Sequence, residues 1–114
     1  MTAKRSSWTL EAARALVADV RTRTARAVEE VDALVTEREA APAESPDRAK
    51  LDARVQEIVG RWSREMEALG LEVKGLWLVD FDNGSGCYCW KWPEEELAYF
   101  HGYEEGFGGR TRIQ

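Results

Sequence analysis

The sequence reads LeuTrpLeuValAspPhe at 76–81 and CysTyrCysTrpLysTrp at 87–92, two short runs of apolar and aromatic residues. Residues 82–86, AspAsnGlySerGly, separate them, and an Asn-Gly pair is typical of a tight turn. The two runs therefore predict a β-hairpin. A third run, LeuAlaTyrPheHis at 97–101, follows a proline and three glutamates. We expect a small three-stranded antiparallel β-meander over residues 71–101.

Alternation along the second run gives its two faces different chemistry. Successive side chains of a strand point to opposite sides, so the aromatic residues share one face and the cysteines share the other. The aromatic face is expected to pack on the helices that precede the sheet.

Two long helices are predicted before residue 71. Apolar side chains recur at spacings of three and four in both segments, which is typical of the heptad seam of a coiled coil. The seam positions are Leu10, Ala13, Val17, Val20, Thr24, Ala27, Val31 and Leu34, then Leu51, Val55, Ile58, Trp62, Met66 and Leu69. Thr9 caps the first helix and Ser45 the second, and Pro42 and Gly70 end them. Residues 8–70 thus predict a long antiparallel helical hairpin.

The whole chain is interpreted as a single α+β domain, residues 1–114. The hairpin is followed by the meander and by a glycine-rich C-terminal tail, residues 102–114, in which four of the eight residues from 102 to 109 are glycine. Two helices alone leave much of both seams exposed. We therefore expect a homodimer or another protein partner to associate through the helices.

Composition excludes several classes of partner. The chain has 114 residues and a net charge of −5, which gives no electrostatic basis for binding nucleic acid. Nowhere does it approach the roughly 18 apolar residues of a membrane helix, and its first eight residues lack the apolar core of a signal peptide. We expect a cytoplasmic protein that binds neither nucleic acid nor membranes.

His101, the only histidine, is the first candidate for chemistry. It ends the third predicted strand, and Glu104 and Glu105 follow it closely. A histidine beside a carboxylate can act as a general base or a metal ligand. The alternative is a partly buried histidine that hydrogen-bonds to the backbone. With Cys87 and Cys89, His101 would supply three ligands for zinc, but buried apolar cysteines with reduced thiols are the favoured account, and we expect no cofactor.

Glu94 and Arg110 are the other candidates. Glu94 opens a run of three glutamates that either serves acid–base chemistry or is simply solvated. The guanidinium of Arg110 would hold a carboxylate or phosphate ligand, or form an internal ion pair with a nearby acid. The sequence contains no phosphate-binding loop, dinucleotide fingerprint, nucleophile elbow or zinc-protease motif.

The run from Cys89 to Arg110, CysTrpLysTrpProGluGluGluLeuAlaTyrPheHisGlyTyrGluGluGlyPheGlyGlyArg, closely resembles the C-terminal signature of the prokaryotic domain-of-unknown-function 2203 family. LeuValAspPhe at 78–81 and TrpThrLeuGluAlaAlaArg at 8–14 extend the resemblance over essentially the whole chain. Residues that match the family pattern are Asp80, Phe81, Cys89, Trp90, Glu94, Tyr99, His101, Gly106, Phe107, Gly109 and Arg110. The chain departs from the pattern at Asp82, Phe100 and Gly102-Tyr103.

The resemblance implies a fold and a signature but no reaction. It favours Trp90, Glu94, His101 and Arg110 among the candidates, either as an aromatic-lined small-molecule site or as an internal network that fixes the tail to the sheet. The sequence therefore favours a binding or assembly module over an enzyme. The alternative is a small enzyme or metalloprotein in which His101 acts with Glu94, Glu104 or Glu105, with His101 and Glu94 as the catalytic candidates.

Overall fold

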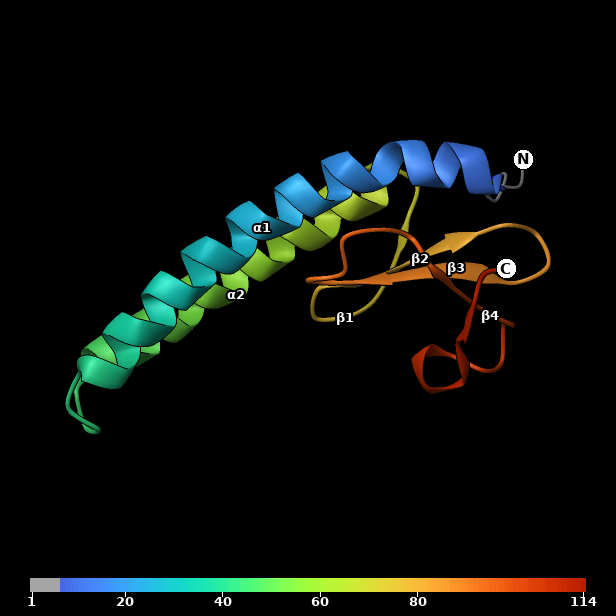
Figure 1. Cartoon of the computed structure of the whole chain (residues 1–114). Helices are drawn as coiled ribbons and strands as arrows, with labels where there is room; N and C mark the ends of the chain where they lie inside the picture. The colour runs from blue at the N-terminus through green and yellow to red at the C-terminus, as the bar shows by residue number, and fades with distance from the viewer. Residues whose placement is uncertain (1–6) are drawn as a thin grey trace, which may run out of the picture.

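The computed structural model describes residues 7–114; residues 1–6, which the sequence assigned to the single domain, lie outside this range. Two helices precede a five-stranded antiparallel sheet, so the chain has an α+β fold. The helices cover one face of the sheet, and the C-terminal segment turns on the side away from the helices before its end joins the edge of the sheet (Figure 1). Neither described helix has a stretch apolar enough to cross a lipid bilayer.

Helix α1 (Leu10–Ala40) begins and ends where the sequence predicted. The hydroxyl of Thr9 accepts a hydrogen bond from the Ala12 N–H at 3.0 Å, which satisfies one of the free amides of the first turn. All of the predicted seam positions of this helix are buried or half-buried. The spacing of apolar residues therefore identified the buried face correctly.

Helix α2 (Pro46–Ala68) is capped by Ser45, whose hydroxyl accepts from the Asp47 N–H at 3.1 Å. Its end is equally well defined. Gly70 adopts a left-handed conformation with φ 92°, and the Leu71 N–H donates to the Met66 carbonyl at 3.1 Å. This is the Schellman arrangement, which returns the chain toward the sheet.

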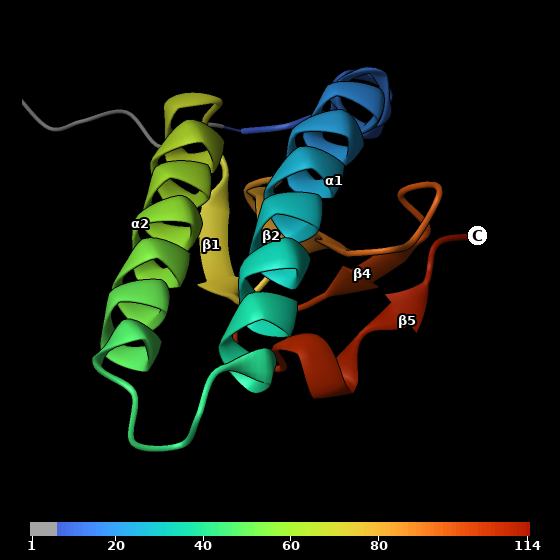
Figure 2. The ribbon, with the colours of Figure 1, turned by 90° about the vertical axis from the view of Figure 1, so that its left-hand side faces the viewer.

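The two helices lie side by side, as Figure 2 shows, but they differ in length. Helix α1 has 31 residues and α2 has 23, so the first turns of α1 continue past α2 and lie over the sheet. There the Arg14 Nε donates to the Leu97 carbonyl at 3.3 Å, and the Trp8 ring meets the Phe81 ring edge-on at 5.4 Å. The structure thus differs from a simple hairpin, because the first turns of α1 also pack over the sheet.

The prediction of three strands was wrong, because the sheet has five. The sheet has the order β1-β2-β3-β4-β5, with β1 (Glu72–Gly75), β2 (Leu78–Asp82), β3 (Cys87–Lys91), β4 (Tyr99–His101) and β5 (Thr111–Arg112). Both additional strands are short and lie at the edges, where most side chains are exposed. They lack the apolar alternation by which a strand is recognised from sequence. The predicted glycine-rich tail is therefore partly ordered, since it also contains the short 3-10 helix η1 (Phe107–Gly109).

Two strands begin later than predicted. Strand β2 starts at Leu78 rather than 76, because Trp77 has φ 59° and turns the chain between β1 and β2. Strand β4 starts at Tyr99 rather than 97, since the Leu97 carbonyl accepts its hydrogen bond from α1. The predicted hairpin between β2 and β3 is present, with Asp82 paired to Cys87.

The hydrophobic core lies between the helices and the sheet. Val79, Phe81 and Trp90 are completely buried on the helix-facing side, and Tyr88 and Trp92 pack against them. The expectation that the aromatic face of the second run packs on the helices is confirmed. Alternation then leaves the polar residues of the same strands on the outer face of the sheet.

Candidate functional site

The outer face of the sheet gathers polar side chains from three neighbouring strands. Asp80 on β2 lies directly opposite Cys89 on β3, and His101 on β4 lies opposite Cys87. Because residues that alternate share a face, all four side chains point away from the helices. All are at most 4% exposed. These four side chains are therefore buried, and part of the C-terminal segment lies on the same side of the sheet (Figure 1).

His101 and Asp80 form a buried pair at the centre of this face. The His101 Nε2 lies 2.9 Å from Asp80 Oδ2, and its Nδ1 lies 2.7 Å from the Gly102 carbonyl oxygen. Both ring nitrogens face oxygen atoms, and the doubly protonated imidazolium donates to both when Asp80 is ionised. Burial lowers the pKa of His101, but the hydrogen bonds to Gly102 and Asp80 and the charge of Asp80 outweigh it, and the pKa is raised.

The second carboxylate oxygen of Asp80, Oδ1, differs from Oδ2 in its hydrogen bonding. Asp80 is 2% exposed, and its Oδ1 is buried with no nitrogen or oxygen hydrogen-bond partner among the described residues, although the Cys89 thiol interacts with the Asp80 carboxylate. Leaving a buried carboxylate oxygen unpaired costs about 1–3 kcal/mol or more. Such an atom calls for an explanation, and a bound cation or hydrogen-bond donor would provide one.

The two cysteines are neutral thiols. Burial, and then the negative charge of Asp80, raises the pKa of both Cys87 and Cys89 to about 12. A thiol with so high a pKa is a poor nucleophile near neutral pH. The Cys89 sulfur belongs to the central cluster, because ligand atoms of Asp80, Cys89 and His101 all lie within 4.8 Å of one another. The sequence had grouped Cys87 with Cys89 and His101; the structure brings Asp80 to the cluster instead.

Arg110 and Glu94 are bound to each other. Arg110 places both arms of its guanidinium on the Glu94 carboxylate, with one contact of 3.1 Å between Nη1 and Oε1. The guanidinium also stacks against the rings of Tyr99, at 4.0 Å, and Phe107, at 4.3 Å. Burial lowers the pKa of Arg110, but the ion pair with Glu94 outweighs this effect and the pKa is raised. Of the two readings of Arg110, the internal ion pair is the one present.

Trp90 takes part in the same network from the other face of the sheet. Its ring is completely buried among core residues, and its Nε1 donates to the Glu94 carbonyl at 3.0 Å. The Glu94 carboxylate also accepts from the Lys91 N–H at 2.9 Å. Of the four residues predicted as a ligand site, three therefore hold the connection after β3 and the C-terminal segment in place, and only His101 faces the space beyond the sheet.

That space is a cleft of about 500 Å³. Asp80 and His101 form part of its floor, and the C-terminal segment contributes one wall. Its lining residues are Glu72, Lys74, Leu78, Asp80, Cys87, His101, Tyr103, Gly106 and Phe107. Its lining combines charged residues of both signs with the apolar Leu78 and Phe107.

A family model described as an uncharacterized conserved protein, DUF2203, matches residues 6–113. The chain belongs to this family. The resemblance identified from the sequence is thereby confirmed over nearly the whole chain. No curated protein and no solved structure matches the chain.

Several of the DUF2203 signature residues contact one another in the structure. Trp90 is joined to Glu94, Glu94 to Arg110, and the Arg110 Nη1 lies 3.9 Å from the Cys89 sulfur in the central cluster. Sequence reasoning missed Asp80 as the partner of His101. Its place on the family pattern, one residue before the end of the strand predicted at 76–81, was the available sign.

The arrangement does not favour His101 as a general base. The carboxylate that reaches it is Asp80, whereas Glu94 binds Arg110 and Glu105 accepts from the Gly102 N–H at 2.7 Å. Both ring nitrogens are engaged, Nε2 with the Asp80 carboxylate and Nδ1 with the Gly102 carbonyl, so neither is free to accept a proton from a substrate.

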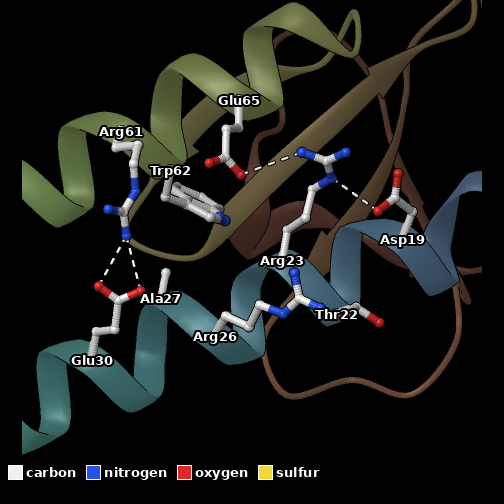
Figure 3. Close-up of a pocket in the computed structure, with 9 residues that line it drawn as sticks. All are labelled: Asp19, Thr22, Arg23, Arg26, Ala27, Glu30, Arg61, Trp62 and Glu65. Carbon is white, nitrogen blue, oxygen red and sulfur yellow. Dashed lines mark hydrogen bonds and ion pairs between the residues drawn. The ribbon is translucent and has the colours of Figure 1, made fainter.

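A second hollow, of about 400 Å³, lies between the helices (Figure 3). Most of its charged residues are paired, since Arg61 reaches Glu30 at 2.9 Å and Arg23 bridges Asp19 and Glu65 at 2.9 and 3.4 Å. The Arg61–Glu30 and Arg23–Glu65 pairs join α1 to α2 at the surface. The hollow is therefore better explained by helix contacts than by a ligand.

Proposed function

We propose that this chain is a binding module, in which the cleft on the outer face of the sheet takes a small ligand and the helical hairpin provides an association surface. The ligand presents a hydrogen-bond donor or a positive group to the carboxylate of Asp80. Cys87 and Cys89 are both free thiols, which supports a reducing, cytoplasmic location for this module.

The observation that carries the ligand site is the unpartnered Oδ1 of Asp80 beside the cleft. The other oxygen of the carboxylate already accepts from His101, so the pair is nearly neutral and one acceptor is left over. The cleft volume of about 500 Å³ falls within the range of roughly 300–1,000 Å³ that small-molecule sites occupy. Leu78 and Phe107 add apolar wall area that would pack against the ligand.

Pyrazole and 1-methylpyrazole test the ligand site, because they have similar shape and only pyrazole carries an N–H donor. We expect pyrazole to shift the amide resonances of residues 78–80 and 101–107 in a nitrogen-15 spectrum of the metal-free chain, and 1-methylpyrazole to shift them less. Residues 41–45, in the turn between the helices, serve as the internal reference.

A matched pair of variants locates the binding. Leu78→Trp fills the cleft and should abolish the shifts, whereas Leu76→Trp adds the same ring at a position that is 55% exposed and outside the cleft. Absence of any pyrazole-dependent shift, or equal shifts in Leu78→Trp, would contradict the ligand site.

The association surface is the part of the hairpin that extends beyond the sheet (Figure 1). There only two helices cover the seam, and Val28 and Val31 are half-buried while Val35 is 40% exposed. These valines are spaced by three and four on α1 and form one apolar stripe. We propose that a second copy of the chain covers this stripe.

Light scattering on a size-exclusion column tests the association. The wild-type chain is expected to have the mass of a dimer at micromolar concentration, and Val35→Glu to have the mass of a monomer. Thr36→Glu adds the same charge on a different side of α1 and should stay dimeric. A monomeric wild type would remove the association half of the proposal and leave the ligand site untouched.

A further inference from the structure

We propose that Asp80, Cys89 and His101 bind a transition-metal ion of the zinc class in the floor of the cleft. This inference rests on the binding function proposed above and names its ligand as a metal ion. Zinc is bound by carboxylate, thiolate and imidazole groups, and three protein ligands with an open fourth position are typical of sites that also bind water or a small molecule.

The three ligands come from three adjacent strands and share one face. Asp80 lies opposite Cys89 across β2 and β3, and His101 reaches the same point from β4. Their ligand atoms lie within 4.8 Å of one another. Two ligands about 2.0–2.1 Å from a tetrahedral zinc are about 3.3 Å apart. The 2.9 Å separation of His101 Nε2 and Asp80 Oδ2 therefore needs to widen by only a few tenths of an ångström.

The surroundings orient these ligands as a metal site requires. His101 Nδ1 donates to the Gly102 carbonyl at 2.7 Å, which fixes the ring so that Nε2 faces Asp80 and Cys89. Histidine ligands in metal sites commonly donate their second nitrogen to a backbone carbonyl in this way. The Oδ1 of Asp80, which has no nitrogen or oxygen partner among the described residues, is a further indication, since an ion bound through both carboxylate oxygens would satisfy it.

The charges of the ion and its proposed ligands also balance. A divalent ion with one carboxylate and one thiolate is neutral, and the neighbouring Arg110 is already paired with Glu94. On binding, the ion replaces the proton of the Cys89 thiol and the proton on His101 Nε2, and both protons leave to solvent. A neutral cluster is what a buried location tolerates. The sulfur and nitrogen ligands favour zinc-class ions over magnesium or calcium.

The fourth position would face the cleft, because Asp80 and His101 both contribute to its lining. A water molecule or a small ligand in the cleft would then complete the coordination. Lys74 and Tyr103 lie on the same lining and would contact such a ligand. The cleft and the cluster thereby become one site.

Cobalt(II) titration tests this inference. The untagged full-length chain is stripped with EDTA, reduced, freed of chelator and titrated with cobalt chloride. We expect one ion per chain, with a thiolate-to-cobalt charge-transfer band in the near ultraviolet that zinc chloride abolishes. Zinc should also raise the midpoint of thermal unfolding by several degrees, because it binds only the folded chain.

Cys89→Ser and Cys87→Ser form the matched pair, since both thiols lie on β3 and are at most 3% exposed. Cys89→Ser should lose the band and Cys87→Ser should keep it, and Asp80→Asn should weaken cobalt binding by more than about tenfold. Circular dichroism of each metal-free variant checks the fold. If Cys89→Ser does not fold, retention of the charge-transfer band in Cys87→Ser still identifies the Cys89 sulfur as the ligand.

Wild-type protein that takes up no cobalt at micromolar concentration would overturn the inference, as would loss of the band in Cys87→Ser. Pyrazole binding by the metal-free chain is measured separately. If the chain binds pyrazole but neither cobalt nor zinc, the metal site is refuted and the proposed binding function stands. If it binds neither pyrazole nor a metal ion, both proposals are refuted.

Discussion

Arg110 donates both arms of its guanidinium to the carboxylate of Glu94, sixteen residues earlier in the chain, and only 15% of the arginine side chain is exposed. The pair ties the last segment of the chain to the connection after β3. That segment forms one wall of the cleft, so the ion pair also determines the shape of the site.

Replacement of Arg110 by lysine is expected to destabilise the protein. Lysine keeps the charge but loses the two-pronged contact with Glu94 and the stacking on Tyr99 and Phe107. We expect the free energy of unfolding to fall by about 1–3 kcal/mol, measured by urea denaturation. Arg112→Lys is the control, because Arg112 is 65% exposed and lies 3.9 Å from an exposed Glu96. A loss as large in the control would contradict the role assigned to Arg110.

The helices could be predicted from the sequence because their information is local. Caps at Thr9 and Ser45 and the regular spacing of apolar residues set both the bounds and the buried face. The edge strands could not be predicted, since β1 and β5 are held by backbone pairing with a neighbour and carry few apolar residues. Their presence depends on the strand beside them, which no local pattern records.

The site was predicted only in part for a related reason. His101, Glu94 and Arg110 were recognisable by residue type and by the family pattern, and Arg110 does lie against aromatic rings. The pairing of acidic and basic side chains depends on the register of the strands. The register of β2 and β3 places Asp80 beside Cys89. Sequence distance suggested Glu104 and Glu105 as partners of His101, whereas the partner comes from a strand 21 residues earlier.

Thr24 in the middle of α1 should be intolerant of an apolar substitution. Its hydroxyl accepts a hydrogen bond from the Trp62 Nε1 at 2.8 Å, and Thr24 is completely buried. Thr24→Val keeps the shape but leaves the buried indole N–H without an acceptor, which costs about 1–3 kcal/mol. Urea denaturation of Thr24→Val and Thr24→Ser provides the comparison. The serine variant keeps the hydroxyl, so an equal loss in both would indicate that packing of the methyl group matters more than the hydrogen bond.

The stability of the metal-free chain is expected to decrease as the pH rises from about 6 to about 8. The pKa of His101 is raised above its ordinary value of 6.5 in the folded protein, because Gly102, Asp80 and Glu105 favour the imidazolium over the effect of burial. Below pH 6.5 both folded and unfolded chains hold the proton, so this stabilisation is fully present. As the pH rises further the unfolded chain releases its proton first, and the contribution is lost progressively up to the folded pKa.

Urea denaturation in EDTA across this range measures the effect. The thiols of Cys87 and Cys89, which face the same side of the sheet, stay neutral in the folded protein because their pKa values are about 12. His101→Gln keeps polar groups at the same place but does not titrate, so its free energy of unfolding should change less between the two pH values. Stability that rises with pH in the wild type, or an unchanged pH dependence in His101→Gln, would show that the buried pair with Asp80 does not hold the histidine in its charged form.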